Sequence, residues 1–237
     1  DLARAVVADM NSIGYKVEMP LGQACCGCPA TNMGDTENAK KEAEINIKGM
    51  EAEKYDYIVS ACPSCTHQLH LYPTFFEEGT EMHKKAKELA DKTYDFCKLF
   101  YELGGMSEEG DGKPIKVTYH DSCHLKRSLK VSKEQRELLK HTKGVEFIEM
   151  NDCDNCCGFG GSYSLLYPEI SAPILGETRL SKTYSGIPNL PLLPDVNPFR
   201  VKGYSLVNLL SIGITKFNSS LLLLISLTYC NLFQSSE

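Results

Sequence analysis

The string Cys25-Cys26-Gly27, followed by Cys62-Pro63-Ser64-Cys65 with 35 residues between Cys26 and Cys62, decides how this chain of 237 residues must fold. A second pair, Cys156-Cys157-Gly158, is preceded by Cys123, with 32 residues between Cys123 and Cys156. Adjacent cysteines do not readily bond to each other, because the ring that would form is far from the preferred disulfide geometry. Paired thiolates completed by thiolates from distant loops are instead the ligands that a soft metal centre needs. The pattern therefore predicts iron–sulfur or other thiolate metal sites, and with them electron transfer.

Short apolar runs stand a few residues before each cysteine group. They predict four strands, at residues 17–19, 57–59, 115–119 and 148–150. Stretches of helical composition or periodicity predict three helices, at residues 36–51, 82–103 and 132–141. Strands that alternate with helices indicate an α/β architecture, whose ligands gather outside the carboxyl ends of the strands. We therefore expect two α/β repeats that present their cysteine loops at those strand ends.

Charge and cysteine content narrow the class of protein. The net charge of −6, with no concentrated basic stripe, argues against a nucleic-acid partner. Eleven cysteines with CC and CxxC spacings, in a chain that opens without a hydrophobic signal segment, favour metal or redox chemistry in a reducing compartment. The sequence has neither a dinucleotide-binding glycine fingerprint nor a P-loop, so a flavin or nicotinamide would be bound by a partner. We expect a cytoplasmic protein.

The last 60 residues differ in composition from the rest of the chain. Residues 1–177 contain 49 charged side chains and residues 178–237 contain 7, and the net charge changes from −9 to +3. The apolar run 221–227 is too short to cross a bilayer. We expect 178–237 to be an atypical, buried or poorly ordered tail rather than a membrane anchor. Its composition also allows that it is not native to the domain.

The first cysteine group supplies four thiolates and the second supplies three. The seven candidate ligands are Cys25, Cys26, Cys62, Cys65, Cys123, Cys156 and Cys157. Four thiolates suit tetrahedral zinc as well as an iron–sulfur cluster, so the residues themselves leave the metal open. Further candidates for ligation, hydrogen bonding to sulfur or redox chemistry stand beside the pairs, namely Cys28, His120, His124 and Cys153. Cys97, within an apolar helical pattern, is expected to be a buried small hydrophobe.

Four strings together carry a resemblance to a known family. They are residues 23–27, 55–65, 117–125 and 156–163, in family order and at family spacing. They resemble the cysteine-rich CCG domain, whose motif is a leading cysteine, then CC, then CxxC, and which occurs twice in iron–sulfur subunits. Members include the CCG-containing subunit of heterodisulfide reductase and the iron–sulfur subunits of glycolate and anaerobic glycerol-3-phosphate oxidation. The similarity spans roughly residues 1–177 and is greatest to the lactate-utilisation members.

The resemblance implies two tandem repeats, the first over 1–104 and the second over 114–177, followed by the tail. It implies that Cys25, Cys26, Cys62 and Cys65 ligate one 4Fe–4S cluster and that Cys123, Cys156 and Cys157 ligate a second. Both motifs depart from the family pattern. The leading cysteine of the first repeat would stand before Asp1, and the closing CxxC of the second is due near residues 193–197, where the sequence reads Leu-Pro-Asp-Val-Asn.

The function that the resemblance implies is an iron–sulfur electron-transfer component of a cytoplasmic complex that oxidises L-lactate to pyruvate. Such an oxidoreductase component would work with the other subunits of that complex, including a ferredoxin-type iron–sulfur protein, and would need neither nucleic acid nor a membrane span. Three alternatives remain open from the sequence. They are a subunit related to heterodisulfide, glycolate or glycerol-3-phosphate chemistry, a zinc-stabilised structural module, and a nonfunctional fragment.

Overall fold

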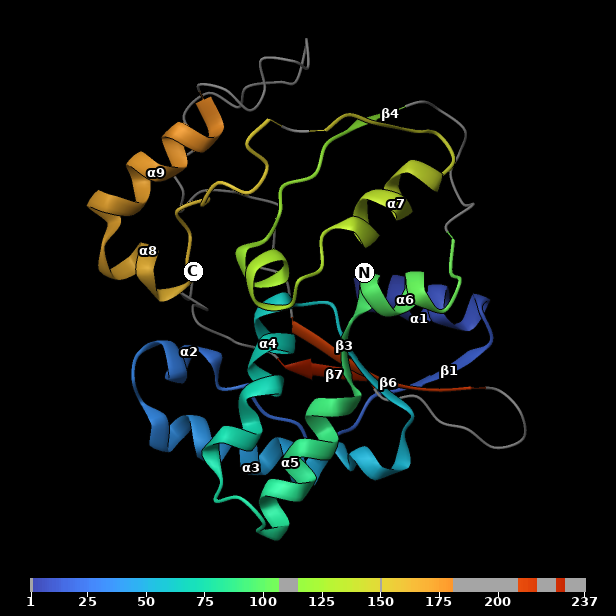
Figure 1. The fold of residues 1–237 in the computed structure, drawn as a ribbon, viewed down its shortest axis with the longest axis vertical. Coiled ribbons are helices and arrows are strands. Elements are labelled where there is room, and N and C mark those ends of the chain that lie inside the picture. Colours follow the sequence, from blue (N-terminus) through green and yellow to red (C-terminus); the bar gives the residue numbers. More distant parts are fainter. Residues whose placement is uncertain (1, 107–114, 150, 181–208, 217–224, 229–237) are drawn as a thin grey trace, which may run out of the picture.

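A computed structural model describes residues 2–106, 115–149, 151–180, 209–216 and 225–228 (Figure 1). Its strands are β1 (Tyr15–Glu18), β2 (Tyr57–Ser60), β3 (Thr93–Asp95), β4 (Ile115–Val117), β5 (Val145–Phe147), β6 (Leu209–Lys216) and β7 (Ile225–Thr228). Its α-helices are α1 (Leu2–Ser12), α2 (Cys28–Asn32), α3 (Thr36–Met50), α4 (Pro63–Leu71), α5 (Glu81–Lys92), α6 (Phe96–Glu102), α7 (Lys133–His141), α8 (Ser162–Leu166) and α9 (Pro168–Leu180). Shorter helical turns are η1 (Ala52–Lys54), η2 (Tyr72–Phe75) and the π-helical η3 (His124–Ser128).

The main sheet has the strand order β1-β6-β2-β3, and β7 pairs with β6. β6 is antiparallel to both β1 and β2, so β1 and β2 run in the same direction. Their carboxyl-terminal residues, Glu18 and Ser60, pair with Gly213 and Ser211 of β6 and therefore reach the same edge of the sheet. The chain leaves this edge twice, toward Cys25-Cys26 after β1 and toward Cys62 after β2.

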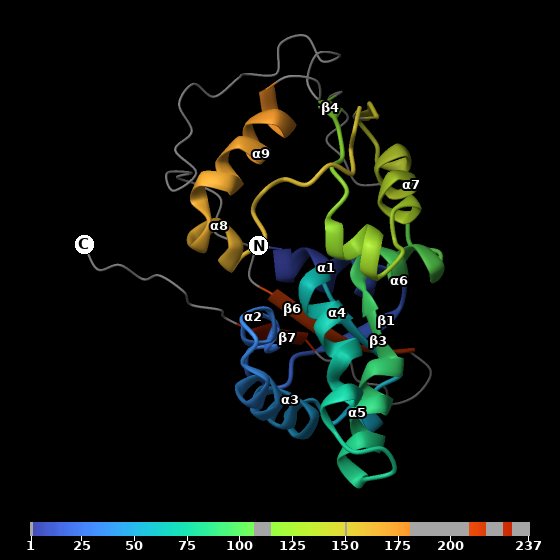
Figure 2. The same cartoon turned by 60° about the vertical axis from the view of Figure 1, so that its left-hand side comes forward.

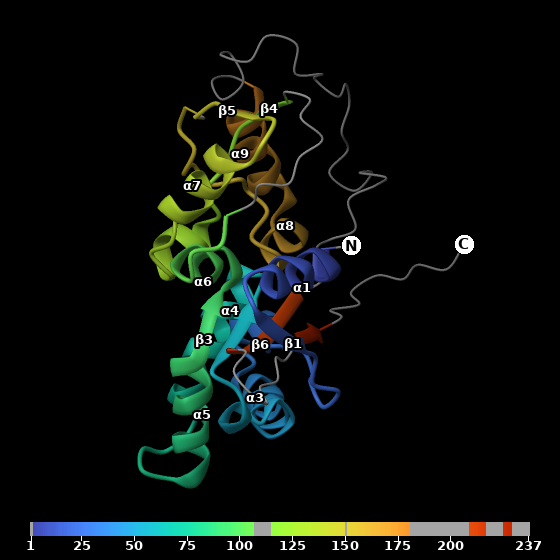
Figure 3. The same ribbon diagram turned by 90° about the vertical axis from the view of Figure 1, so that its right-hand side faces the viewer.

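Helices cover both faces of the main sheet, because neighbouring side chains of a strand point to opposite faces. Val59 packs with Val6 and Met10 of α1 and with Leu99 and Phe100 of α6. Its neighbour Ile58 packs on the other side, in a cluster drawn from α3, α4 and α5. Figure 3 shows the same layers, with α1 and α6 above the sheet and α3 and α5 below it.

The second repeat has the same arrangement on a smaller scale. β4 and β5 form a parallel pair in which Val117 lies opposite Phe147, so both strands end at the same edge. Cys123 follows β4 and the Cys156 loop follows β5. In Figure 2, β4 and α7 lie on one side of this upper half of the molecule, and α8 and α9 lie on the other. The predicted α/β class, with cysteine loops after strand ends, is confirmed.

Several predicted boundaries change. The helices expected at 36–51 and 132–141 are α3 and α7, but the one expected at 82–103 is two helices separated by β3. Thr93 and Tyr94 favour extended backbone, and Thr93 Oγ1 donates to the Leu89 carbonyl at 2.7 Å as α5 ends. The strand expected at 148–150 is β5, three residues earlier, although Ile148 N still donates to the Val117 carbonyl at 2.8 Å.

The expected tail begins inside α9 and supplies two strands to the sheet of the first repeat. Backbone pairing places β6 between β1 and β2, although residues 209–216 lie far from both in the sequence. The expected linker at 107–113 and the segment 193–197 lie outside the described residues. The expected domain limits stay predictions.

Truncating Ile58 tests whether the cluster beneath the sheet supports the fold. Ile58 is 1% exposed, so Ile58→Ala should lower the free energy of unfolding by about 3 kcal/mol, through lost burial and the cavity left behind. Ile45→Ala makes the same chemical change on the exposed side of α3, where Ile45 is 48% exposed. Urea denaturation of both variants is the measurement, and equal losses would contradict the assigned core.

Candidate thiol-rich centres

Three cysteines of the first group, Cys26, Cys62 and Cys65, pack together with Cys28, whereas Cys25 is not part of this cluster. Cys26, Cys28 and Cys65 form a buried cluster, and the half-buried Cys62 packs against it. Cys26 and Cys65 are joined as a disulfide across a Cα–Cα distance of 5.7 Å, while Cys25, Cys28 and Cys62 are not disulfide-bonded. The structure thus brings the CC loop and the CxxC segment together, as the sequence predicts, and adds Cys28 to the group.

Two buried polar side chains clamp the backbone of the CC loop. Asn46, in the middle of α3, accepts a hydrogen bond from Ala24 N at 2.9 Å and donates to the Cys25 carbonyl at 2.7 Å. Asn46 also donates to the Tyr72 hydroxyl at 2.9 Å, and that hydroxyl donates to the Cys26 carbonyl at 3.0 Å. Neither Asn46 nor Tyr72 is exposed to solvent. The path of three consecutive residues is therefore fixed by side chains from outside the loop.

The approach to the loop is equally restricted. Gly49 of α3 lies against the backbone of Gly22, and a Cβ at Gly49 would overlap the Gly22 carbonyl. Only a glycine allows the helix and the loop to come this close. The loop therefore lies directly on α3, which allows Asn46 to reach it.

The CxxC segment begins α4. Cys62 is the N-cap residue and Pro63 occupies the first helical position, where proline's missing N–H is not needed. Ser60 Oγ accepts from Cys62 N at 3.1 Å, and Thr66 Oγ1 donates to the Cys62 carbonyl at 3.0 Å. These bonds fix the turn that brings Cys65 into the buried cluster.

Burial keeps these thiols protonated. Desolvation raises the pKa of Cys62, although hydrogen bonds from the backbone of Cys65 and Ser64 act in the opposite direction. Desolvation also raises the pKa of Cys28, and the nearby Cys62 and Cys25 add to the effect. Because metals bind the thiolate, these cysteines would release protons on ligation.

The second group is more open. Cys123 and Cys156 are exposed, Cys157 is half-buried, and all three are free thiols. Their two loops are tied together by Asp121 N, which donates to the Cys153 carbonyl at 2.8 Å, and by His120, whose Nε2 lies 2.9 Å from the Asn155 carbonyl. Cys153, a candidate for an additional ligand or redox thiol, donates to Asp121 Oδ2 at 3.4 Å, and its role stays a prediction.

A salt-bridge network holds the second pair of loops. Arg136 of α7 donates to both carboxylate oxygens of Asp121, at 2.8 and 3.1 Å, and to both of Glu149, at 2.8 and 2.9 Å. Burial alone would raise the pKa of Asp121, but hydrogen bonds from Arg136, Lys126 and Ser132 outweigh it and hold that pKa well below its usual range. The Asp121 side chain is 1% exposed, so this charged pair is a buried structural element.

The two cysteine groups meet through a histidine pair. His67 lies two residues after Cys65 on α4, and His124 follows Cys123 directly in η3. Their ring centroids are 5.5 Å apart. Burial and the proximity of His124 and His70 lower the pKa of His67. Figure 1 shows α4 running from the lower half of the molecule up to the second repeat.

The donor set fits a soft metal, but the described residues do not stand in a metal-binding arrangement. Among them, no group of three or more histidine, cysteine or acidic side chains is positioned to hold a metal ion. In the first group the sulfur atoms of Cys26 and Cys65 are joined to each other, so neither is present as a thiol. Reducing that disulfide would leave four packed thiols, the ligand type that iron–sulfur clusters and zinc require.

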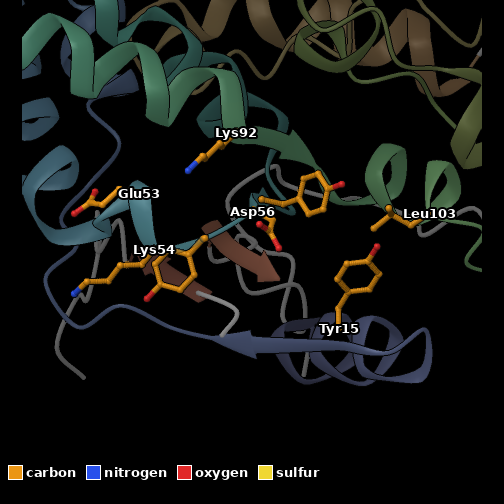
Figure 4. A pocket seen from close by; sticks show the side chains of 8 residues that line it. Tyr15, Glu53, Lys54, Asp56, Lys92 and Leu103 are labelled. Atoms are coloured by element: carbon orange, nitrogen blue, oxygen red, sulfur yellow. The ribbon is translucent and has the colours of Figure 1, made fainter. Parts of the chain in front are cut away.

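The hollow found among the described residues lies apart from the candidate cysteines. A hollow of about 540 Å³ is lined by tyrosine, lysine and acidic side chains, with Tyr15, Lys54 and Lys92 among them, and no candidate cysteine lines it (Figure 4). Within the part of the chain that the structure describes, no helix has the length and apolar character needed to span a membrane. Cys97 is half-buried, and desolvation raises its pKa to about 12.

Comparisons with known proteins place these groups in a family context. The family model of the cysteine-rich CCG domain matches residues 2–70 and 117–180. The chain is 38% identical to lactate utilization protein A of Bacillus subtilis over 177 residues, which cover 75% of this chain and 74% of the relative. Proteins of the same name from Bacillus velezensis and Oceanobacillus iheyensis are 37% and 34% identical, with 74% and 72% of their lengths covered and 75% of this chain in each case. No solved structure matches.

The residues that hold the loops are not evident from the sequence. From the sequence, Asn46 would be predicted to be an ordinary polar residue of a helix and Tyr72 to be part of an apolar run. Arg136 would be predicted to be a solvent-exposed charge on a helix. A polar side chain on the otherwise apolar face of Ala39, Ala43, Ile47 and Met50 is the signal that would point to Asn46.

Replacing Asn46 tests the clamp on the CC loop. Asn46→Ala would leave the Cys25 carbonyl and Ala24 N buried without their partner, and should lower the free energy of unfolding by about 2 kcal/mol. Asn38→Ala, on the exposed part of the same helix, is the matched control and should cost less. Urea denaturation measures both, and a clamp variant as stable as the control would argue against the assigned role.

The Asp121–Arg136 pair predicts a defined loss of stability in acid. Because the folded pKa of Asp121 is depressed, its contribution is complete above the unfolded pKa of about 3.9 and disappears as the pH falls through the folded value. Asp121→Asn should cost about 3 kcal/mol at pH 7 and flatten the decline of stability between about pH 4 and 2. Asp154→Asn, at an exposed carboxylate whose pKa is lowered by its hydrogen bond with Lys126, should change the acid profile much less, because solvent screens an exposed pair. The check is a series of urea denaturations across this pH range.

Proposed function

The chain belongs to the family of cysteine-rich CCG domain proteins, and from that membership we propose that it is an iron–sulfur electron-transfer component of L-lactate utilisation. The proposed ligands are Cys25, Cys26, Cys62 and Cys65 for one 4Fe–4S cluster and Cys123, Cys156 and Cys157 for a second site. The lactate part of the proposal is supported by the relatives named lactate utilization protein A, which are 34–38% identical to this chain.

One observation supports the iron–sulfur part, namely the packing of Cys26 from the CC loop with Cys62 and Cys65 from the CxxC segment. Neutral thiols gain little from being gathered in this way, whereas a soft metal centre needs several sulfur ligands around one point. Reduction of the Cys26–Cys65 disulfide by two electrons and two protons would supply the two remaining thiols. A bound iron–sulfur cluster would supply one-electron transfer at a potential set by its surroundings.

The residues of this chain position the ligands. Asn46 and Tyr72 hold the CC loop against α3, so the sulfur atoms of Cys25 and Cys26 start from a fixed backbone. Ser60 and Thr66 do the same for Cys62. His67 and His124, which follow Cys65 and Cys123 closely in the sequence, are in ring contact, and this contact supports the proposal that electrons pass between two centres. Burial of Cys26, Cys28 and Cys65 excludes water from the first centre.

We propose that the oxidation of lactate itself takes place on a partner. The sequence carries no dinucleotide-binding fingerprint or P-loop, and the hydride or electron-pair chemistry of lactate oxidation needs an organic cofactor. The proposed partners are the other subunits of a lactate-oxidising complex, including a ferredoxin-type iron–sulfur protein. Free thiols persist in a reducing compartment, which favours the cytoplasm.

Anaerobic reconstitution with ferrous iron and sulfide tests the cluster. The reduced wild-type chain and Cys97→Ser should both gain iron, acid-labile sulfide and an electron paramagnetic resonance signal after reduction. Cys62→Ser should gain less of each, because it lacks a first-site ligand. Cys97 is the matched control, since it is a half-buried thiol outside both groups. Uptake of one zinc and no iron would contradict the proposal and favour a zinc-stabilised module.

The substrate is tested separately by complementation. A Bacillus subtilis strain that lacks its lactate utilization protein A should recover growth on L-lactate when it expresses this chain, and should not recover with Cys62→Ser. A chain that binds iron yet fails to restore growth at normal expression would contradict the lactate role and leave the cluster in place.

A further inference from the structure

Cys28 belongs to the same packed group as three of the candidate ligands. It is 8% exposed, beside Cys26 at 4% and Cys65 at 1%, and Cys62 packs against this group. Cys28 lies outside the CC and CxxC motifs, so the family pattern gives it no role. Its position is nevertheless nearly as deep in the thiol group as that of the motif cysteines.

The conformation of Gly27 explains how Cys28 reaches this group. Gly27 has a φ of 83°, in the left-handed region that favours glycine, and α2 begins directly after it. A Cβ at this residue would come within 3.3 Å of the Ala39 carbonyl oxygen in α3. The chain therefore turns sharply between Cys26 and Cys28 while pressed against α3. The turn places both cysteines in one cluster.

Two contacts fix Cys28 opposite the CxxC segment. The buried Gln68 of α4 donates to Thr31 Oγ1 of α2 at 2.8 Å, which ties the helix of Cys28 to the helix of Cys65. Asn32 donates through Nδ2 to the sulfur atom of Cys28 at 3.5 Å. An N–H donor beside a ligating sulfur is the kind of outer contact that orients and tunes metal sites.

We propose that Cys28 is a further thiolate ligand of the first centre. For a simple soft divalent ion it completes a four-sulfur set with Cys26, Cys62 and Cys65, the thiols that pack with it, and takes the place of Cys25, which is not in that packed group. On binding a divalent metal, the Cys28 thiol loses its proton to solvent and a sulfur–metal bond forms, with no change in oxidation state. As a cluster ligand, Cys28 rests on the proposed function. As a ligand for a simple soft divalent ion, it can be tested without iron, sulfide or lactate.

Cobalt binding provides that test, since thiolate–Co²⁺ charge-transfer absorption reports the number of sulfur ligands. All variants would carry Cys123→Ser and Cys156→Ser, which replace two exposed thiols and leave the second group with Cys157 alone. The reduced, anaerobic proteins compared are this background, Cys25→Ser, and Cys25→Ser with Cys28→Ser. Cys25→Ser with Cys97→Ser is the matched control.

The expected result is that Cys25→Ser and its Cys97 control keep the absorption of a four-thiolate site. Cys25→Ser with Cys28→Ser should lose about a quarter of it, as expected for one of four ligands, and bind Co²⁺ at least about tenfold more weakly. If Cys25→Ser alone shows the loss and Cys28→Ser adds nothing, Cys28 is not a ligand. Cys28→Ala repeats the comparison without a buried hydroxyl, and circular dichroism checks that each variant is folded.

Cobalt and iron together separate the two proposals. A chain that takes up no iron on reconstitution, yet loses cobalt absorption only when Cys28 is replaced, refutes the iron–sulfur function and retains the Cys28 site. A chain that forms a cluster, but whose cobalt absorption does not change when Cys28 is replaced, supports the iron–sulfur function and refutes the Cys28 site.

Discussion

The hydrogen bonds from Asn46 and Tyr72 to the Cys25-Cys26 backbone are the constraint on which the first thiol centre depends. Adjacent cysteines need an unusual backbone path if both thiols are to be useful, and a surface loop does not hold such a path by itself. Here the buried side chains of Asn46 and Tyr72 hydrogen-bond to each other and to the loop backbone, which leaves the loop little freedom to change its path. The position of Cys28 after the Gly27 turn is a consequence of the same fixed loop.

The two repeats hold their cysteine loops with different kinds of interaction. In each, two strands that run in the same direction end at one sheet edge and deliver cysteine loops there, which is where α/β folds gather ligands; β4 and β5 pair directly, whereas β6 lies between β1 and β2. The first repeat locks its loops with neutral hydrogen bonds inside a dry core. The second uses the charges of Arg136, Asp121 and Glu149 around more exposed cysteines. Of the two, only the salt bridges of the second repeat should weaken strongly as the pH falls, because their carboxylates become protonated.

Much of this arrangement is readable in the sequence because cysteine chemistry is local and conspicuous. The CC and CxxC spacings predict the convergence of the loops that follow β1 and β2, and the Ala, Glu and Lys content of residues 36–51 predicts α3. The break of the 82–103 helix at Thr93 is missed, since a three-residue strand is a weaker signal than the helical periodicity around it. Asn46 and Arg136 are missed because their partners lie 21 and 15 residues away, and nothing in their own neighbourhoods marks them.

The place of β6 in the main sheet has a consequence for how the protein is made. β1 and β2 carry the loops of the first centre, yet each pairs with β6 rather than with the other. Residues 209–216 leave the ribosome after both cysteine groups have been synthesised. The pairing of β1 and β2 with β6 can therefore form only after residues 209–216 have emerged. Such long-range pairing is intrinsically slow, so the sheet that carries the first cysteine group is completed only after every cysteine of both groups has been synthesised.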